Sequence, residues 1–77
     1  MRIRIKYFGW IAEQVNKREE DLELDLNSLN ELKDYLKNKN QFQEDSSIRY
    51  AVNQELVDDA KLQDNDLVAL LPPFAGG

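Results

Sequence analysis

The sequence closes with LVALLPPFAGG (67–77), an apolar run of strand length that is followed by two prolines and four more residues. Successive residues of a strand point to opposite faces of a sheet, so LVALL (67–71) presents two alternating sets of side chains. Pro72 and Pro73 end this strand, because proline has no backbone N–H to donate to a neighbouring strand. The stretch predicts a last strand over 67–71 and an extended tail over 72–77.

A second alternating stretch, MRIRIKYF (1–8), predicts the first strand. One face of this strand is apolar and is expected in the core; it carries Met1, Ile3, Ile5 and Tyr7. Phe8 shares the opposite face with three cations, Arg2, Arg4 and Lys6. We therefore place Phe8 outside the predicted core, and the alternative is that it folds over an edge of the core.

The segment between these strands predicts two helices. Gly9 interrupts the first strand, and WIAEQVN (10–16) has the spacing of a short helix. The main helix is expected to begin at Asn27 or Ser28, because Ser28 and Glu31 have the spacing of a capping box. It ends at KNKN (37–40) and carries one apolar stripe, which consists of Leu29, Leu32, Tyr35 and Leu36.

Three further segments complete the predicted elements. LELDL (22–26) alternates leucine with acidic residues, which predicts the second strand, and QFQEDSS (41–47) is typical of a loop. IRYAVN and QELV (48–57) predict two short strands on either side of a tight turn. One amphipathic helix must then cover one face of a sheet, so we expect an α+β roll. A single domain over 1–71 with a tail over 72–77 fits a chain of 77 residues.

The composition excludes most catalytic chemistry. The chain has no cysteine and no histidine, so disulfides, thiolate or imidazole metal sites and histidine-assisted nucleophiles are excluded. A net charge of -5 argues against a nucleic-acid partner. We expect a cytoplasmic protein, since no apolar run has the length of a membrane span or a signal peptide. The adjacent carboxylates at 19–21, 58–59 and 64–66 are expected to be solvated charges and not metal ligands.

The tail has the properties of a substrate. Its prolines favour a stiff, extended exit, and its six residues reach at most about 20 Å. Gly76 and Gly77 have no side chain, so they can pass through a channel too narrow for a Cβ atom. The terminal carboxylate is ionised at neutral pH and can attack the α-phosphate of ATP in a partner's active site. The alternative is that the tail is only a frayed chain end.

Three blocks of the sequence resemble the ubiquitin-like sulfur-carrier family (MoaD/ThiS), in particular the small, MoaD-type subunits of molybdopterin synthase. These blocks are YFGWIAE (7–13), AVNQELV (51–57) and LQDNDLVALLPPFAGG (62–77). Asn65 stands where the family usually has glycine, which a turn tolerates because asparagine also adopts positive φ. Ala12 stands where some relatives have arginine, which puts a partner contact there in doubt.

The resemblance implies a β-grasp fold with a mixed sheet of about five strands, in which the first and last strands are parallel at the centre. It also implies that an activating enzyme adenylates Gly77 with ATP, and that a sulfur-donating enzyme supplies sulfur for a thiocarboxylate. The large subunit of the synthase would then transfer this sulfur to cyclic pyranopterin monophosphate, in a heterotetramer whose catalytic lysines belong to the large subunit. The chain itself would bind no cofactor or metal and would not be catalytic alone.

The same resemblance and the strand patterns predict a surface for the partner. If Leu71 faces away from the main helix, then Phe8, Leu71 and Leu56 form an apolar patch at the base of the tail. Alternation alone leaves open which side chains of the last strand face the helix. Within the tail, Pro72 and Pro73 are expected to aim the chain, and Phe74 and Ala75 to line the partner's channel.

Two other functions share some of these features. Sulfur carriers for thiamin thiazole, cysteine or tRNA thiolation have the same fold and the same glycine pair at the end. The double proline after the last strand favours the molybdopterin branch over the thiazole carriers. A non-catalytic binding module or protein modifier is the alternative from a different class.

Overall fold

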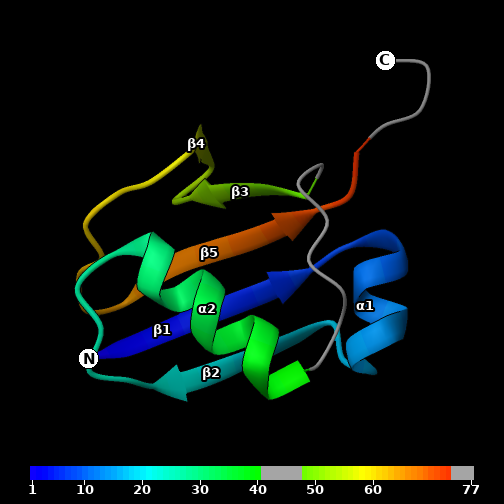
Figure 1. The fold of residues 1–77 in the computed structure, drawn as a ribbon, viewed down its shortest axis with the longest axis horizontal. Coiled ribbons are helices and arrows are strands. Elements are labelled where there is room, and N and C mark those ends of the chain that lie inside the picture. Colours follow the sequence, from blue (N-terminus) through cyan, green and yellow to red (C-terminus); the bar gives the residue numbers. More distant parts are fainter. Residues whose placement is uncertain (41–47, 74–77) are drawn as a thin grey trace.

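A computed structural model describes residues 1–40 and 48–73 of the chain. Within these residues the fold consists of a five-stranded sheet and two helices (Figure 1). The predicted loop 41–47 and the tail residues Phe74, Ala75, Gly76 and Gly77 lie outside the described residues. Neither helix of the described ranges has the length and apolar character that crossing a membrane requires.

The sheet is mixed, with strand order β2-β1-β5-β3-β4. The elements are β1 (Arg2–Tyr7), α1 (Gly9–Val15), β2 (Glu19–Glu23), α2 (Leu29–Asn40), β3 (Arg49–Val52), β4 (Glu55–Val57) and β5 (Asp66–Leu71). The first and last strands, β1 and β5, pair in parallel, and the other pairs are antiparallel. Helix α2 crosses one face of the sheet (Figure 1). The predicted α+β roll and its parallel central strands are confirmed.

The core lies between α2 and the face of the sheet that α2 covers, which we call the inner face. Alternate residues of β1 and β5 point inward, and α2 contributes its apolar stripe. The fully buried side chains are Ile3, Ile5, Ile11, Leu29, Leu32, Leu36, Val68 and Leu70. The predicted inner face of β1 is therefore confirmed. The inward set of β5, which the sequence left open, is Val68 and Leu70.

The start of α2 and the turn between β3 and β4 follow local sequence rules. Ser28 Oγ accepts a hydrogen bond from the Glu31 backbone N–H at 3.3 Å, and the Glu31 carboxylate accepts one from the Asn27 N–H at 2.7 Å. The predicted cap is thus confirmed. Asn53 and Gln54 both have positive φ, at 51° and 72°, as a two-residue hairpin turn of type I′ requires.

The predicted bounds of the second strand are wrong. The strand covers Glu19–Glu23 and not 22–26. The reason is its pairing with β1, which sets Lys6 opposite Glu19 and Arg4 opposite Asp21. Arg4 Nε lies 2.9 Å from Asp21 Oδ1. The charged residues before the leucines therefore belong to the strand, because their carboxylates face the cations of the neighbouring strand.

Two of the acidic residues that we expected to be solvated have largely buried side chains. Asp66 is 9% exposed, and its carboxylate accepts hydrogen bonds from Asn53 Nδ2 at 3.0 Å and the Gln63 N–H at 2.8 Å. It ties the β3–β4 turn to the start of β5. Burying this charge is tolerated because both carboxylate oxygens accept a hydrogen bond.

Glu20 is the second of these residues. Its side chain is 10% exposed and accepts hydrogen bonds from Tyr7 Oη at 2.5 Å, Lys39 Nζ at 2.8 Å and Lys17 Nζ at 3.1 Å. Burial alone would raise the pKa of Glu20, but the hydrogen bonds from Lys39, Tyr7 and Lys17 outweigh it and lower the pKa to about 2. This carboxylate joins β2 to the last turn of α2.

Candidate functional site

The tail begins at the end of the sheet where α1 lies. Because β1 and β5 are parallel, they end on the same side of the molecule, beside α1 (Figure 1). The Phe8 N–H donates a hydrogen bond to the Leu70 carbonyl at 3.2 Å, which continues the pairing one residue past β1. Pro72 is half-buried and Pro73 is exposed. The base of the tail is therefore fixed by the central strand pair.

Leu71, the last residue of β5, faces away from α2. The burial of β5 alternates, with Leu70 buried and Leu71 half-buried on the opposite, outer face of the sheet. The parallel pairing sets Tyr7 beside Leu70, so the next residues, Phe8 and Leu71, are neighbours. Phe8 is 43% exposed and lies outside the core. The sequence predicted an apolar patch only if Leu71 faces away from the main helix, and Leu71 does face away from it.

Leu56 lies on the same outer face but farther from the tail. It is 57% exposed on the edge strand β4 and pairs with Ala51, which in turn pairs with Ala69 of β5. Strand β3 thus separates Leu56 from the tail-bearing strand. We call the apolar residues of this face the outer patch; they are Phe8, Leu56, Leu67, Ala69 and Leu71.

Cations flank the outer patch near the tail. Arg49 pairs with Leu71 across β3 and β5, and Lys6 pairs with Ala69 across β1 and β5. Neither forms a salt bridge with a residue of the described ranges. The chain as a whole carries a net charge of -5. Two cations therefore lie at the rim of the outer patch in a chain that is acidic overall.

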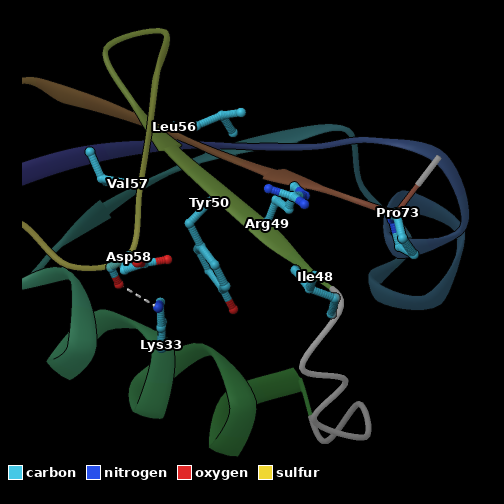
Figure 2. Close-up of a pocket in the computed structure, with 8 residues that line it drawn as sticks. All are labelled: Lys33, Ile48, Arg49, Tyr50, Leu56, Val57, Asp58 and Pro73. Carbon is cyan, nitrogen blue, oxygen red and sulfur yellow. Dashed lines mark hydrogen bonds between the residues drawn. The ribbon is translucent and has the colours of Figure 1, made fainter. Parts of the chain in front are cut away.

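A groove of about 510 Å³ runs along the β3–β4 side of the sheet, from Lys33 to Pro73 (Figure 2). Lys33 Nζ donates a hydrogen bond to the Asp58 carbonyl at 2.7 Å and lies 4.8 Å from the centre of the Tyr50 ring. These contacts hold α2 to the strands. Of the two cations that line the groove, Lys33 and Arg49, Lys33 is thus engaged in contacts within the fold.

Two residues beside the tail were not singled out by the sequence. Trp10, in the first turn of α1 and two residues after Phe8, is 38% exposed and is a second exposed aromatic residue in this part of the chain. Gly9 has φ +59° and lies against the ring of Pro72. In the sequence, Gly9 is predicted only to interrupt the first strand. Its position directly after a strand and before a helix was the available signal.

The reactive residues expected from the sequence, Gly76 and Gly77, lie outside the described residues, as do Phe74 and Ala75. The structure brings together Phe8, Leu71, Pro72 and Pro73 at the base of the tail, and it places Leu56 farther along the same face. The candidate site is accordingly a defined tail base next to an open, partly apolar surface.

The sheet order and the single helix across one face define a ubiquitin-like β-grasp protein. Residues 5–77 match the model of the ThiS family, and the chain belongs to this family. A comparison with curated protein sequences found no match.

Solved structures agree with this class. The chain is similar to a putative molybdopterin converting factor, subunit 1, from Pyrococcus furiosus, with 25% identity, a TM-score of 0.82 and coverage of 96% of this chain and 99% of that one. It is similar to the complex of subunits 1 and 2 of molybdopterin-converting factor from Helicobacter pylori, with 26% identity, a TM-score of 0.73 and full coverage of both chains. SAMP1 from Haloferax volcanii shares the fold, with 21% identity, a TM-score of 0.79 and full coverage of both chains.

Proposed function

We propose that this chain is the sulfur-carrying small subunit of a molybdopterin synthase, and that its Gly77 carboxylate is converted to a thiocarboxylate. The observation that carries this proposal is the sequence PPFAGG placed directly after β5, the central strand of a ThiS-family fold. Pro72 and Pro73 directly follow this paired strand, and proline favours an extended backbone.

The group that we propose to carry the sulfur is the Gly77 carboxylate. The chain has no thiol and no imidazole, so its own side chains offer no conventional nucleophile for sulfur transfer. The ionised carboxylate of Gly77 attacks the α-phosphate of ATP in an activating enzyme, and pyrophosphate leaves. A sulfur-donating enzyme then supplies the sulfur that displaces AMP, which gives the thiocarboxylate. When that sulfur is transferred to cyclic pyranopterin monophosphate, water cleaves the bond between the Gly77 carbonyl carbon and the sulfur, which returns the carboxylate. ATP is consumed by the activating partner.

The proposed partner is a large synthase subunit, in a heterotetramer. Support comes from the similar Helicobacter pylori protein, which was solved as a complex of subunits 1 and 2. We assign the contact to Phe8, Leu56 and Leu71 of the outer patch. Pro72, Pro73, Phe74 and Ala75 would lead Gly76 and Gly77 into the partner's active site.

In vitro reconstitution tests the proposal. Thiocarboxylated chain, the large subunit and cyclic pyranopterin monophosphate are combined, and molybdopterin is measured. We expect product in proportion to the thiocarboxylate supplied. A chain that lacks Gly77 should keep the same melting temperature but should not be adenylated. Absence of product, together with sulfur delivery to a thiazole, to cysteine synthesis or to tRNA, would assign the chain to another branch of sulfur carriers.

A further inference from the structure

We propose that Gly9 is a positioning residue for the tail: because it has no side chain, the ring of Pro72 packs against the β1–α1 connection and the tail leaves the sheet in one direction. The part of this inference that concerns activity rests on the proposed function. The part that concerns the direction of the tail does not.

Two independent features require glycine at position 9. Its φ is +59°, in the left-handed region that a residue with a Cβ atom rarely adopts. A Cβ atom built there would lie 2.8 Å from Pro72 Cγ, 3.6 Å from Pro72 Cδ and 3.7 Å from Pro72 Cβ. The first distance is much shorter than the 3.5–4.0 Å of a normal contact between carbon atoms. If residue 9 had a side chain, either the ring of Pro72 or the backbone at residue 9 would therefore have to move.

The backbone at position 9 is held on both sides. The Phe8 N–H is hydrogen bonded to the Leu70 carbonyl, and the Ile11 N–H to the Phe8 carbonyl, each at 3.2 Å. Ile11 is fully buried in the core. Pro72 directly follows β5 and its ring fixes its own φ. Since Gly9 is anchored through its neighbours, Pro72 is the side that has to move.

A shift at Pro72 changes the course of everything that follows it in the chain. The tail would have to place one carboxylate in a partner's active site, and a misplacement of about 1 Å can cost about 100-fold in rate. The contact between Gly9 and Pro72 therefore affects the reaction without either residue meeting a reacting atom.

The chain offers a matched control. Asn16, at the other end of α1, has φ 62°, so Asn16→Ala introduces a similar backbone penalty to Gly9→Ala. Pro72→Ala removes Cγ and Cδ and leaves only the Cβ atom, at an ordinary contact distance from a new Cβ at position 9. The effect of Gly9→Ala on the direction of the tail should accordingly vanish in the Pro72→Ala background. A double-mutant cycle measures this.

The first experiment needs no partner. The chain has no native cysteine, so Glu13→Cys on α1 accepts a single nitroxide label. Paramagnetic broadening of the Gly76 and Gly77 amides is then measured in the labelled chain by NMR. We expect Gly9→Ala to change this broadening, and Asn16→Ala to leave it as in the parent. Equal broadening in the parent and in Gly9→Ala, or a change that persists unaltered with Pro72→Ala, would overturn the inference.

The second experiment uses the activating enzyme. Gly9→Ala should lower the rate of Gly77 adenylation about tenfold or more, while Asn16→Ala, with a similar loss of melting temperature, should not. Equal rates for the two variants would overturn the role of Gly9 in positioning. A parent chain that is not adenylated at all would contradict the proposed function, and the nitroxide data would still decide the direction of the tail.

Discussion

Leu70 and Leu71 are neighbours in the chain but face opposite sides of the sheet. Leu70 is fully buried against α2, whereas Leu71 is half-buried on the outer patch. Leu70→Ala should lower the free energy of unfolding by about 2–5 kcal/mol because it leaves a cavity in the core. Leu71→Ala should lower the free energy of unfolding by only about 1 kcal/mol, and it should weaken binding to the large subunit that we propose as the partner.

Urea unfolding and calorimetric titration with the large subunit measure the two effects separately. Phe8→Ala should behave as Leu71→Ala does. If Leu71→Ala lost as much unfolding free energy as Leu70→Ala, with no loss of binding beyond what misfolding explains, Leu71 would be a core residue and not a contact residue.

Glu20 makes the fold sensitive to acid. Its pKa is lowered from an ordinary value near 4.5 to about 2. The stabilisation by its charged form is fully present above about pH 4.5 and is lost as the pH falls towards 2. A shift of this size corresponds to about 3 kcal/mol at neutral pH. Glu20→Gln should therefore lower the free energy of unfolding at pH 7 and flatten its decrease between pH 4.5 and pH 2.

The control for Glu20 is Glu19→Gln, an exposed residue of the same strand. Glu19→Gln should lose less unfolding free energy at pH 7 than Glu20→Gln does, because the Glu19 side chain is exposed. An unchanged acid sensitivity in Glu20→Gln would show that other carboxylates carry the effect.

The first turn of α2 depends on its cap. Ser28 accepts a hydrogen bond from the Glu31 N–H, which has no partner within the helix. Ser28→Ala should lower the free energy of unfolding by about 1 kcal/mol. Asn38→Ala, an exposed substitution inside the same helix, should leave it unchanged or raise it slightly, since alanine favours helix. Urea unfolding of both variants tests this, and equal losses would argue against the cap.

Element types could be predicted from the sequence where one side-chain pattern dominates. The period of two in β1, the apolar stripe of α2 and the short hairpin of β3 and β4 each depend on local features. Strand β2 was misplaced because its outward residues are charged and pair with cations that come from another strand. Local hydrophobicity carries no information about such a partner.

The candidate site could be predicted only in part, for the same reason. The tail is visible in the sequence because its prolines and glycines are adjacent. The contact of Gly9 with Pro72, and the buried carboxylate of Glu20 between Tyr7 and Lys39, join residues that are distant in the chain. The fold alone brings these groups together.

The charge of the whole molecule is uneven. The chain is acidic overall, but Arg49 and Lys6 flank the outer patch. Reversing a charge at the rim of an interface mainly changes the association rate and its dependence on salt. Arg49→Glu should therefore slow association with the large subunit, whereas Lys61→Glu, an equal change of charge outside the outer patch, should have a smaller effect. Stopped-flow kinetics at low and high salt measure this, and equal effects would argue against docking through this face.

The central claim is that the carboxylate of Gly77 is the group that carries sulfur, as a thiocarboxylate. Intact-mass spectrometry of the chain, purified from its own cells, tests this claim most directly. The claim predicts a fraction of chains in which one oxygen at Gly77 is replaced by sulfur, and no such fraction when Gly77 is deleted. An unmodified Gly77 in every chain, or Gly77 joined to lysines of many other proteins, would contradict it.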